Sequence, residues 1–167
     1  MLKKINSEKA PKAIGPYSQA IHYKDLIFIS GQLPINPIEG KILNDSIKDQ
    51  TVQTLENIEK ILEEANSSWN HVIKVEIFLK DLNHFSIVNE LYAKKVNPKI
   101  QPARHVIEVS RLPMDSLIEI SCIAYTNVWD YDWANYVHIL MRIVHNQNLI
   151  NALIAQSDRV PGFGPGG

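Results

Sequence analysis

The segment LIEISCIAY, residues 117–125, separates its side chains into two faces with the period of two that is typical of a β-strand. One face holds small or apolar residues alone, namely Ile118, Ile120, Cys122 and Ala124. The opposite face carries Glu119 between apolar side chains. This strand therefore predicts a sheet with one face packed against helices and a second face that is either wet or covered by another copy of the chain.

The helix that would cover the apolar face lies between Ser46 and Ala65. Its apolar residues recur at spacings of three and four, which gives one continuous stripe. Ser46 and Asp49 have nearly the form of a capping box, with Asp in the place of the usual Glu or Gln. Asn44 or Asp45 would cap the helix equally well, so the sequence leaves its first residue open.

A strand and a second helix follow directly. HVIKVEIFLKDL, residues 71–82, has the content of a strand. Its alternation places one apolar set on the face toward the helices, namely Ile73, Val75, Ile77 and Leu79. NHFSIVNELYAKKV, residues 83–96, returns to helical spacing, with Asn83 as a candidate N-cap.

Shorter segments supply the remaining strands. LIFIS, residues 26–30, and RHVIEVSRL, residues 104–112, have strand composition, and short strands are expected at 2–5 and 18–22. PINPIEG, residues 34–40, is expected to be a loop because of its prolines and its final glycine. This order of elements predicts an α+β fold, with two helices on one face of a mixed sheet.

The last 42 residues differ in kind from the rest of the chain. They hold two of the three tryptophans and four of the seven glycines. We therefore divide the chain into a domain of residues 1–125 and a C-terminal extension of residues 126–167. The extension is expected to be partly helical, from about Trp133 to Ala155, and to end in the Gly/Pro-rich VPGFGPGG. A helix with so many apolar residues would have to pack against another apolar surface or remain unformed.

Composition and charge exclude several classes of protein. With 17 basic and 18 acidic residues the net charge is −1, so no general attraction to nucleic acid or anionic lipid is expected. The single cysteine, Cys122, can form no internal disulfide. No apolar run reaches the ~18 residues that span a bilayer, and the N-terminal residues lack the apolar core of a signal peptide. We therefore expect a cytoplasmic protein without a membrane segment.

No common cofactor or metal motif is present. The six histidines are scattered without H-E-x-x-H spacing, and no G-x-G-x-x-G, P-loop or G-x-S-x-G pattern occurs. We expect neither a metal nor a cofactor. Taken singly, Arg104, Glu119 and Tyr17 would be ordinary surface or packing residues.

The combination of motifs changes that interpretation. KAPKAIGPYSQAI, ISGQLPINP, FLKDLNHFSIVNELY and PARHVIEVSRLP followed by IEI, in this order, resemble the RidA/YjgF family of imine deaminases. The likeness covers about residues 3 to 125. It implies a chorismate-mutase-like fold and a homotrimer whose three sheets form a central barrel. The sites would then lie in clefts between subunits.

The resemblance also implies roles for single residues. Arg104, in PAR, would grip the substrate carboxylate with two parallel N–H···O bonds. Glu119 matches the first glutamate of the family's EIE pattern and would carry out acid–base work on water and on the leaving nitrogen. Tyr17 would close over the substrate, aimed by the Gly15-Pro16 turn. These three residues are the expected catalytic group.

Further residues are expected around the substrate. Ser30 and Gly31 match the site-lining SG, where hydroxyl and backbone groups would contact the ligand. Asn89, in the VN motif, would bind the ligand or support the site. Val106 stands where many members carry a cysteine, which would shift substrate preference toward apolar side chains. Ser121 replaces the second glutamate of the EIE pattern.

The resemblance implies a hydrolytic deaminase of short 2-imino acids. Its substrates would be 2-iminobutanoate and 2-iminopropanoate, which pyridoxal-phosphate enzymes generate from threonine and serine, and its products 2-keto acids and ammonia. Two alternatives stay open: an RNA-directed endoribonuclease or translation inhibitor, and a ligand-binding or chaperone-like trimer without turnover. Because the charge is balanced, the RNA-directed role ranks below the deaminase.

Overall fold

The computed structural model describes residues 2–126 and 141–142. The chain divides into two units, Met1–Asn127 and Val128–Gly167, and every element named below belongs to the first. The helix predicted at 133–155 and the Gly/Pro-rich end lie outside the described residues, apart from residues 141–142.

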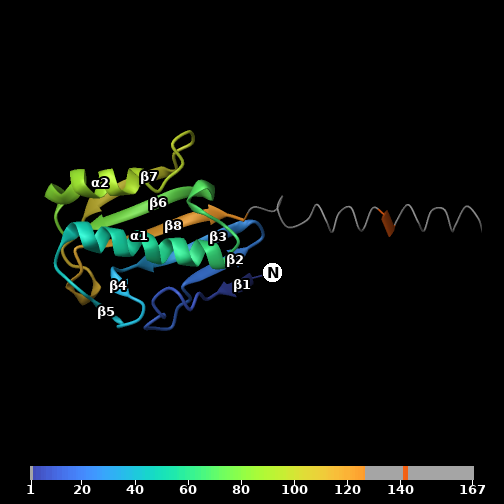
Figure 1. Cartoon of the computed structure of the whole chain (residues 1–167), viewed down its shortest axis with the longest axis horizontal. Coiled ribbons are helices and arrows are strands. Elements are labelled where there is room, and N and C mark those ends of the chain that lie inside the picture. The colour runs from blue at the N-terminus through green and yellow to red at the C-terminus, as the bar shows by residue number, and fades with distance from the viewer. Residues whose placement is uncertain (1, 127–140, 143–167) are drawn as a thin grey trace, which may run out of the picture. The chain divides into compact units, whose positions relative to one another are not determined.

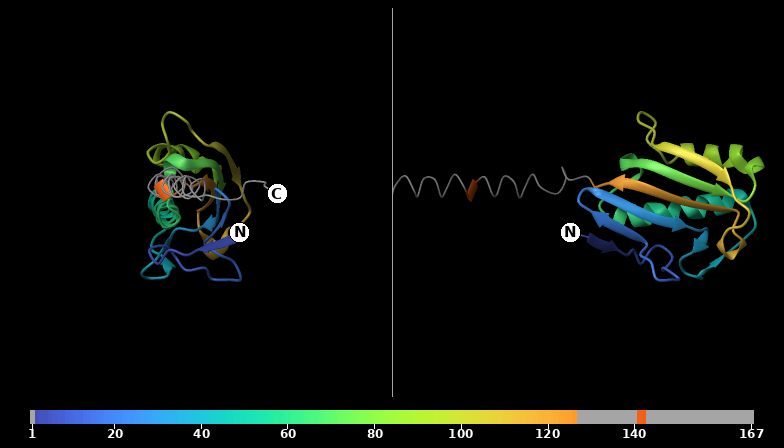
Figure 2. Two further views of the ribbon diagram at one scale, coloured as in Figure 1. Left: turned by 90° about the vertical axis from the view of Figure 1, so that its right-hand side faces the viewer. Right: turned by 180° about the vertical axis from the view of Figure 1, so that it is seen from behind.

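A six-stranded sheet forms the centre of the first unit (Figure 1). Its spatial order is β1 (Leu2–Ile5), β2 (Ala20–Tyr23), β3 (Leu26–Gln32), β8 (Ile118–Tyr125), β6 (Val72–Leu79) and β7 (Ala103–Glu108). Neighbouring strands are antiparallel except β6 and β7, which run parallel. The helices α1 (Ile47–Glu64) and α2 (Phe85–Ala93) lie on one face, and the view from behind shows the other (Figure 2). The predicted α+β fold is therefore confirmed.

The segment 117–125 forms β8, which lies inside the sheet between β3 and β6. Its predicted apolar face is confirmed, because each of four alternate side chains is at most 3% exposed: Ile118, Ile120, Cys122 and Ala124. On both sides they pair with buried neighbours, as Ile29 pairs with Cys122 and Ile77 with Ile120. This layer and the buried side of α1 make up most of the core.

Of the three candidate caps that the sequence left open, Ser46 is the N-cap of α1. The Ser46 hydroxyl accepts a hydrogen bond from the Asp49 backbone N–H at 3.3 Å. The reciprocal bond of a capping box does not come from Asp49. Instead the Asn44 side-chain oxygen accepts from the Ser46 N–H at 3.0 Å. Two of the candidate caps, Ser46 and Asn44, therefore each satisfy one backbone N–H at the start of the helix. No described helix has the length and hydropathy needed to cross a membrane.

Alternation in β6 is broken at its start, and the prediction for Ile73 is wrong. The register of β6 with β8 shifts between Val72 and Lys74. As a result Val72 is buried, whereas Ile73 is 44% exposed. An extra residue at such a bulge reverses the faces on one side of it, and no local sequence signal announces this.

Two smaller predictions are also corrected. The segment before α2 forms a 3₁₀ turn, η2 (Leu82–His84), and its cap is Asp81, whose carboxylate accepts from the Asn83 N–H at 2.8 Å. Asn83 therefore lies inside the turn and is not the N-cap. The predicted loop at 34–40 contains part of a small hairpin, in which β4 (Ile35–Asn36) pairs with β5 (Lys41–Ile42). Side-chain and turn hydrogen bonds specify both features, and apolar periodicity does not detect them.

The sheet face away from the helices is rich in apolar side chains. Register places Leu26 opposite Tyr125 and Phe28 opposite Ile123 on this face. Leu26, Phe28 and Tyr125 are 36–40% exposed. The second face predicted from residues 117–125 therefore exists, and it is neither fully polar nor covered by any described part of the chain.

Candidate functional site

Arg104 lies on the edge strand β7 and faces the helices. Its register partner on β6 is Val75, which is buried in the helix-side core. The guanidinium carbon lies 4.7 Å from the ring centroid of Tyr92 and 5.8 Å from that of Phe85, both on α2. Among the described residues no carboxylate pairs with Arg104, so aromatic surfaces hold the group while its N–H donors stay available for an anion.

Phe85 and Tyr92 were not among the residues predicted for the site. Both belong to the apolar stripe of FSIVNELY, where they are interpreted as packing residues. Their spacing of seven puts them on the same helical face, two turns apart. This spacing was the one feature of the sequence that could have pointed to Phe85 and Tyr92. It shows that two aromatic rings share a helical face, but it does not show which strand residue contacts them.

Glu119 lies on the opposite face of the sheet. Its register partner on β6 is Phe78, whose neighbours on that face include His105. The carboxyl is half-buried, and this burial raises the pKa of Glu119 above the usual glutamate range. No described cation lies near enough to offset the effect. A carboxyl that holds its proton more readily than usual is suited to exchange protons with water.

Gly31 provides the space in which the Glu119 carboxyl lies. A Cβ atom built on Gly31 would overlap Oε1 of Glu119 and would lie 2.8 Å from its Cδ. Any other residue at position 31 would therefore displace the carboxyl. Gly31 belongs to an irregularity in β3, where the register with β8 shifts between Ile29 and Gln32. The predicted site residues Gly31 and Glu119 are thus in contact.

Ser30 anchors the preceding loop. Its hydroxyl donates to the Ser18 carbonyl at 2.7 Å, and its backbone N–H donates to the Gln19 carbonyl at 3.0 Å. Because the hydroxyl proton is already used, Ser30 can offer a ligand only its oxygen lone pairs.

Tyr17 lies in a tight turn, as Gly15-Pro16 predicts. The Tyr17 backbone N–H donates to the Gly15 carbonyl at 2.8 Å, which closes a three-residue turn around Pro16. The phenol oxygen accepts from the Ile14 backbone N–H at 3.3 Å, and the residue is 49% exposed. In one chain the ring therefore folds back on its own loop, and its place over a substrate remains a prediction.

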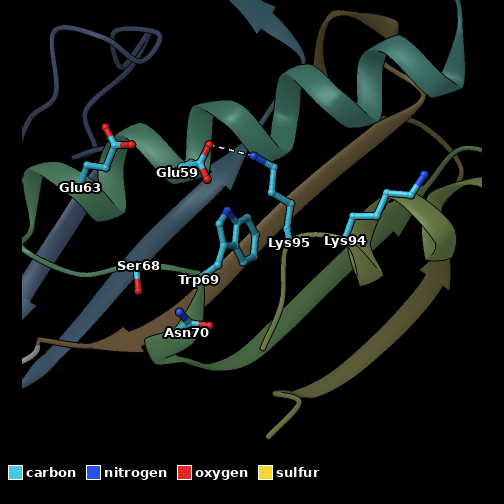
Figure 3. Close-up of a pocket in the computed structure, with 7 residues that line it drawn as sticks. All are labelled: Glu59, Glu63, Ser68, Trp69, Asn70, Lys94 and Lys95. Carbon is cyan, nitrogen blue, oxygen red and sulfur yellow. Dashed lines mark hydrogen bonds and ion pairs between the residues drawn. The ribbon is translucent and has the colours of Figure 1, made fainter. Parts of the chain in front are cut away.

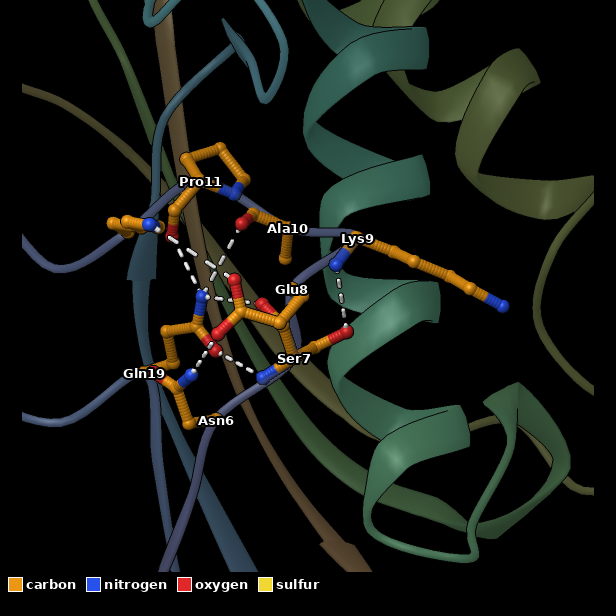
Figure 4. Close-up of polar contacts among 8 residues, drawn as sticks. Asn6, Ser7, Glu8, Lys9, Ala10, Pro11 and Gln19 are labelled. Atoms are coloured by element: carbon orange, nitrogen blue, oxygen red, sulfur yellow. Dashed lines mark hydrogen bonds and ion pairs between the residues drawn. The ribbon is translucent and has the colours of Figure 1, made fainter.

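Gln19 fixes the other end of this loop (Figure 4). Its side chain is 1% exposed and accepts from the Ser7 N–H at 2.7 Å. Its amide nitrogen donates to the carbonyls of Ser7 and Pro11 at 3.1 and 2.7 Å. This role of Gln19 was not predicted from the sequence. The available signal was an amide three residues after the Gly15-Pro16 pair, since one amide can satisfy several loop backbone groups.

Asn89 and Val106 lie on the same side of the sheet as Arg104. Asn89 is half-buried on α2, four residues after Phe85 and three before Tyr92, so it shares their helical face. Val106 pairs with Ile77 and packs against the core. The predicted residues thus form two groups: Arg104, Val106 and Asn89 lie on the helix side of the sheet, and Glu119 and Gly31 meet on the other side. One copy of the chain does not bring the two groups together.

A separate cavity of about 420 Å³ lies between the C-terminal ends of the two helices (Figure 3). It is lined by Glu59, Glu63, Ser68, Trp69, Asn70, Lys94 and Lys95, none of which the sequence analysis selected. Each of its charged groups already has a partner: Lys95 binds Glu59, Lys60 binds Glu63 and Lys94 binds Glu90. Within the described residues no three His, Cys, Asp or Glu side chains gather as metal ligands.

Comparison with known proteins places this arrangement in a family. The family model described as Endoribonuclease L-PSP matches residues 7–126. A RutC family protein of Pyrococcus horikoshii is 55% identical over 125 residues, which are 75% of this chain and 98% of that protein. The chloroplastic Reactive Intermediate Deaminase A of Arabidopsis thaliana is 46% identical over 120 residues, 72% of this chain and 64% of that protein.

A solved structure agrees with these sequences. The crystal structure of E. coli TdcF with bound serine is similar with a TM-score of 0.70 at 36% identity, and the match covers 75% of this chain and 99% of that one. The family model alone spans more than two thirds of the chain. The chain therefore belongs to the endoribonuclease L-PSP family, which is also the family of the RidA and RutC proteins.

Proposed function

We propose that this chain is a hydrolytic deaminase of short 2-imino acids, with 2-iminobutanoate and 2-iminopropanoate as substrates. One observation carries the proposal: two side chains of opposite charge, Arg104 and Glu119, each lack an ion-pair partner within the described chain and are each held by neutral neighbours. Charged groups arranged in this way are available to a ligand. The Arabidopsis relative is named a reactive intermediate deaminase, and the E. coli neighbour holds an amino acid, which supports a ligand of this size.

The reaction would divide between the two groups. The Arg104 fork binds both oxygens of the substrate carboxylate. Glu119 in its ionised form takes a proton from a water molecule whose oxygen adds to the C=N carbon, and it passes that proton to nitrogen, which gives a carbinolamine. Glu119 then takes the proton of the new hydroxyl group and delivers it to the amino nitrogen. The C–N bond breaks as the C=O bond forms, so a 2-keto acid and ammonia leave and the carboxylate is regenerated. Such imines also hydrolyse unaided, so the enzyme need supply only part of the usual barrier reduction.

The two groups would meet between copies of the chain. Because Arg104 and Glu119 lie on opposite faces of one sheet, a shared substrate requires a second copy. The apolar open face around Phe28 and Tyr125 supports such an assembly. We propose a homotrimer in which this face lines a central barrel. Sedimentation analysis tests the assembly, and a monomer at assay concentration would contradict it.

The decisive experiment supplies 2-iminobutanoate from threonine with a pyridoxal-phosphate threonine dehydratase and measures 2-oxobutanoate release. The protein is expected to accelerate release, and Arg104→Ala to abolish the acceleration. Arg111→Ala is the matched control, because Arg111 is exposed and bound to Asp115. Equal rates with and without the protein would remove the deaminase function. RNA cleavage that survives Arg104→Ala would instead favour the endoribonuclease alternative.

A further inference from the structure

Two arginines, Arg104 within β7 and Arg111 three residues after its end, are held by different kinds of contact. Arg111 donates from Nε and from a terminal nitrogen to the two oxygens of Asp115, at 2.7 and 3.1 Å. Its charge is neutralised and two of its donors are used. Arg104 instead lies over the faces of Tyr92 and Phe85. An aromatic face attracts a guanidinium without consuming its charge or its N–H groups.

Tyr92 is the nearer of these two faces and is itself firmly placed. The residue is 5% exposed, and its ring meets Trp69 edge to face, with centroids 6.5 Å apart and an interplanar angle of 87°. Phe85 is 40% exposed, so its ring is less constrained by packing. The rigid part of the support beneath Arg104 is therefore the ring of Tyr92, which Trp69 holds from the side.

The hydroxyl of Tyr92 has no hydrogen-bond partner among the described residues, although it is buried. It therefore contributes little to holding the side chain in place, and the ring face is what Arg104 contacts. Burial raises the pKa of Tyr92 to about 12, so the ring remains a neutral phenol at neutral pH. A neutral surface does not compete with the carboxylate of a substrate for the guanidinium.

We infer that Tyr92 is a positioning residue that holds Arg104 in the orientation needed to bind both carboxylate oxygens of a 2-imino acid. The inference rests on the proposed function and assigns to the helix α2 a direct part in substrate capture. A flexible arginine without this platform would spend part of its time in rotamers that present one donor or none, so affinity would fall. Chemistry at the C=N carbon, which depends on Glu119, would change little.

The test compares three variants on the full chain. Tyr92→Leu removes the aromatic face, Tyr92→Phe keeps it, and Val88→Ala weakens α2 packing at a side chain that is 1% exposed without touching Arg104. The probe is 2-oxobutanoate, whose Kd is measured by calorimetry beside KM and kcat for 2-iminobutanoate. Tyr92→Leu is expected to raise Kd and KM about three- to tenfold with kcat within about twofold. Tyr92→Phe should retain the wild-type Kd, and Val88→Ala should lower only the urea midpoint.

Each result has a definite reading. An unchanged Kd in Tyr92→Leu, or an equal rise in Val88→Ala, would overturn the inference. Should Tyr92→Leu not fold, proton NMR of the unsubstituted protein and of Tyr92→Phe still tests the inference. In both proteins a ring over Arg104 must shift the side-chain proton resonances of Arg104 upfield. Ordinary chemical shifts for these protons would overturn the inference. Arg104→Ala separates this inference from the proposed function. If Arg104→Ala leaves turnover intact, the proposed function fails. If Arg104→Ala loses turnover but Tyr92→Leu keeps the wild-type Kd, only the positioning role of Tyr92 is rejected.

Discussion

The two faces of the sheet hold opposite charges by different means. On the helix side, Arg104 rests on aromatic rings that come from α2 of the same chain. On the open side, Glu119 lies in the space that Gly31 leaves, on a surface that no described element covers. The first group is supported within one chain, whereas the second faces the surface proposed for assembly. If Arg104 binds the carboxylate and Glu119 acts on the imine, as proposed, the two roles depend on separate parts of the fold, and substitutions should separate them.

The largest expected effect comes from Glu119→Gln, which removes proton transfer but keeps the shape of the side chain. We expect kcat to fall by about 10²- to 10⁴-fold with the Kd for 2-oxobutanoate nearly unchanged. Glu108→Gln is the matched control, because Glu108 lies on the other face, where its carboxylate accepts from the Leu82 N–H. A normal kcat in Glu119→Gln would show that Glu119 does not transfer protons in the reaction.

Gly31→Ala tests the same side through its geometry. The added Cβ would overlap the Glu119 carboxyl and push it aside, so we expect kcat to fall about tenfold to hundredfold. Gly40→Ala provides the control, since position 40 has a φ of +67° and open space around it. That variant should lose stability through backbone strain and keep its activity. Equal kcat losses in the two variants would mean that the effect is not local to Glu119.

The pH dependence sharpens the comparison further. Burial raises the pKa of Glu119, and its ionised form is the proposed base, so kcat should fall about tenfold per pH unit below that raised pKa. The acid limb should therefore begin above the ordinary glutamate pKa of about 4.3. Glu119→Gln should abolish the limb in the residual activity. An acid limb at or below the ordinary value would contradict the proposed role.

The same pKa shift affects stability. The ionised form of Glu119, which the proposed reaction needs, is the form that destabilises the folded protein. A raised folded-state pKa means that ionised Glu119 destabilises the folded protein above that pKa. The penalty disappears as the pH falls to the ordinary glutamate value. Glu119→Gln should accordingly unfold at higher urea concentration than the parent at neutral pH, and the difference should vanish near pH 4. Unfolding curves at several pH values measure it.

The smallest effect concerns the loop that contains Tyr17 and Gln19. Gln19→Ala removes an amide that satisfies several backbone groups of residues 7–11. We expect a loss of about 1–3 kcal/mol in the free energy of unfolding. Gln101→Ala, at an exposed position in the loop before β7, should cost almost nothing. Equal urea midpoints for the two variants would show that the Gln19 hydrogen bonds contribute no stability.

Local patterns in the sequence predicted the parts that local forces specify. The helix between Ser46 and Ala65 and the apolar face of residues 117–125 were correct, because periodicity and capping act within a few residues. Ile73 was misplaced because a bulge depends on the partner strand. The candidate residues came from their likeness to a family, and the structure brings Gly31 and Glu119 together but not Arg104 and Glu119.

By itself the sequence determined which residues of β8 share a face, where the stripe of α1 lies, and which polar groups accompany the family's motifs. Only the tertiary structure decided which way β7 faces. Its alternation has two possible settings, and the pairing of β7 with β6 turns Arg104 toward the helices, whereas the apolar face of β8 had already indicated that Glu119 faces away from them. Contacts such as Tyr92 beneath Arg104 and Glu119 over Gly31 join residues far apart in the chain, so no local pattern could encode them.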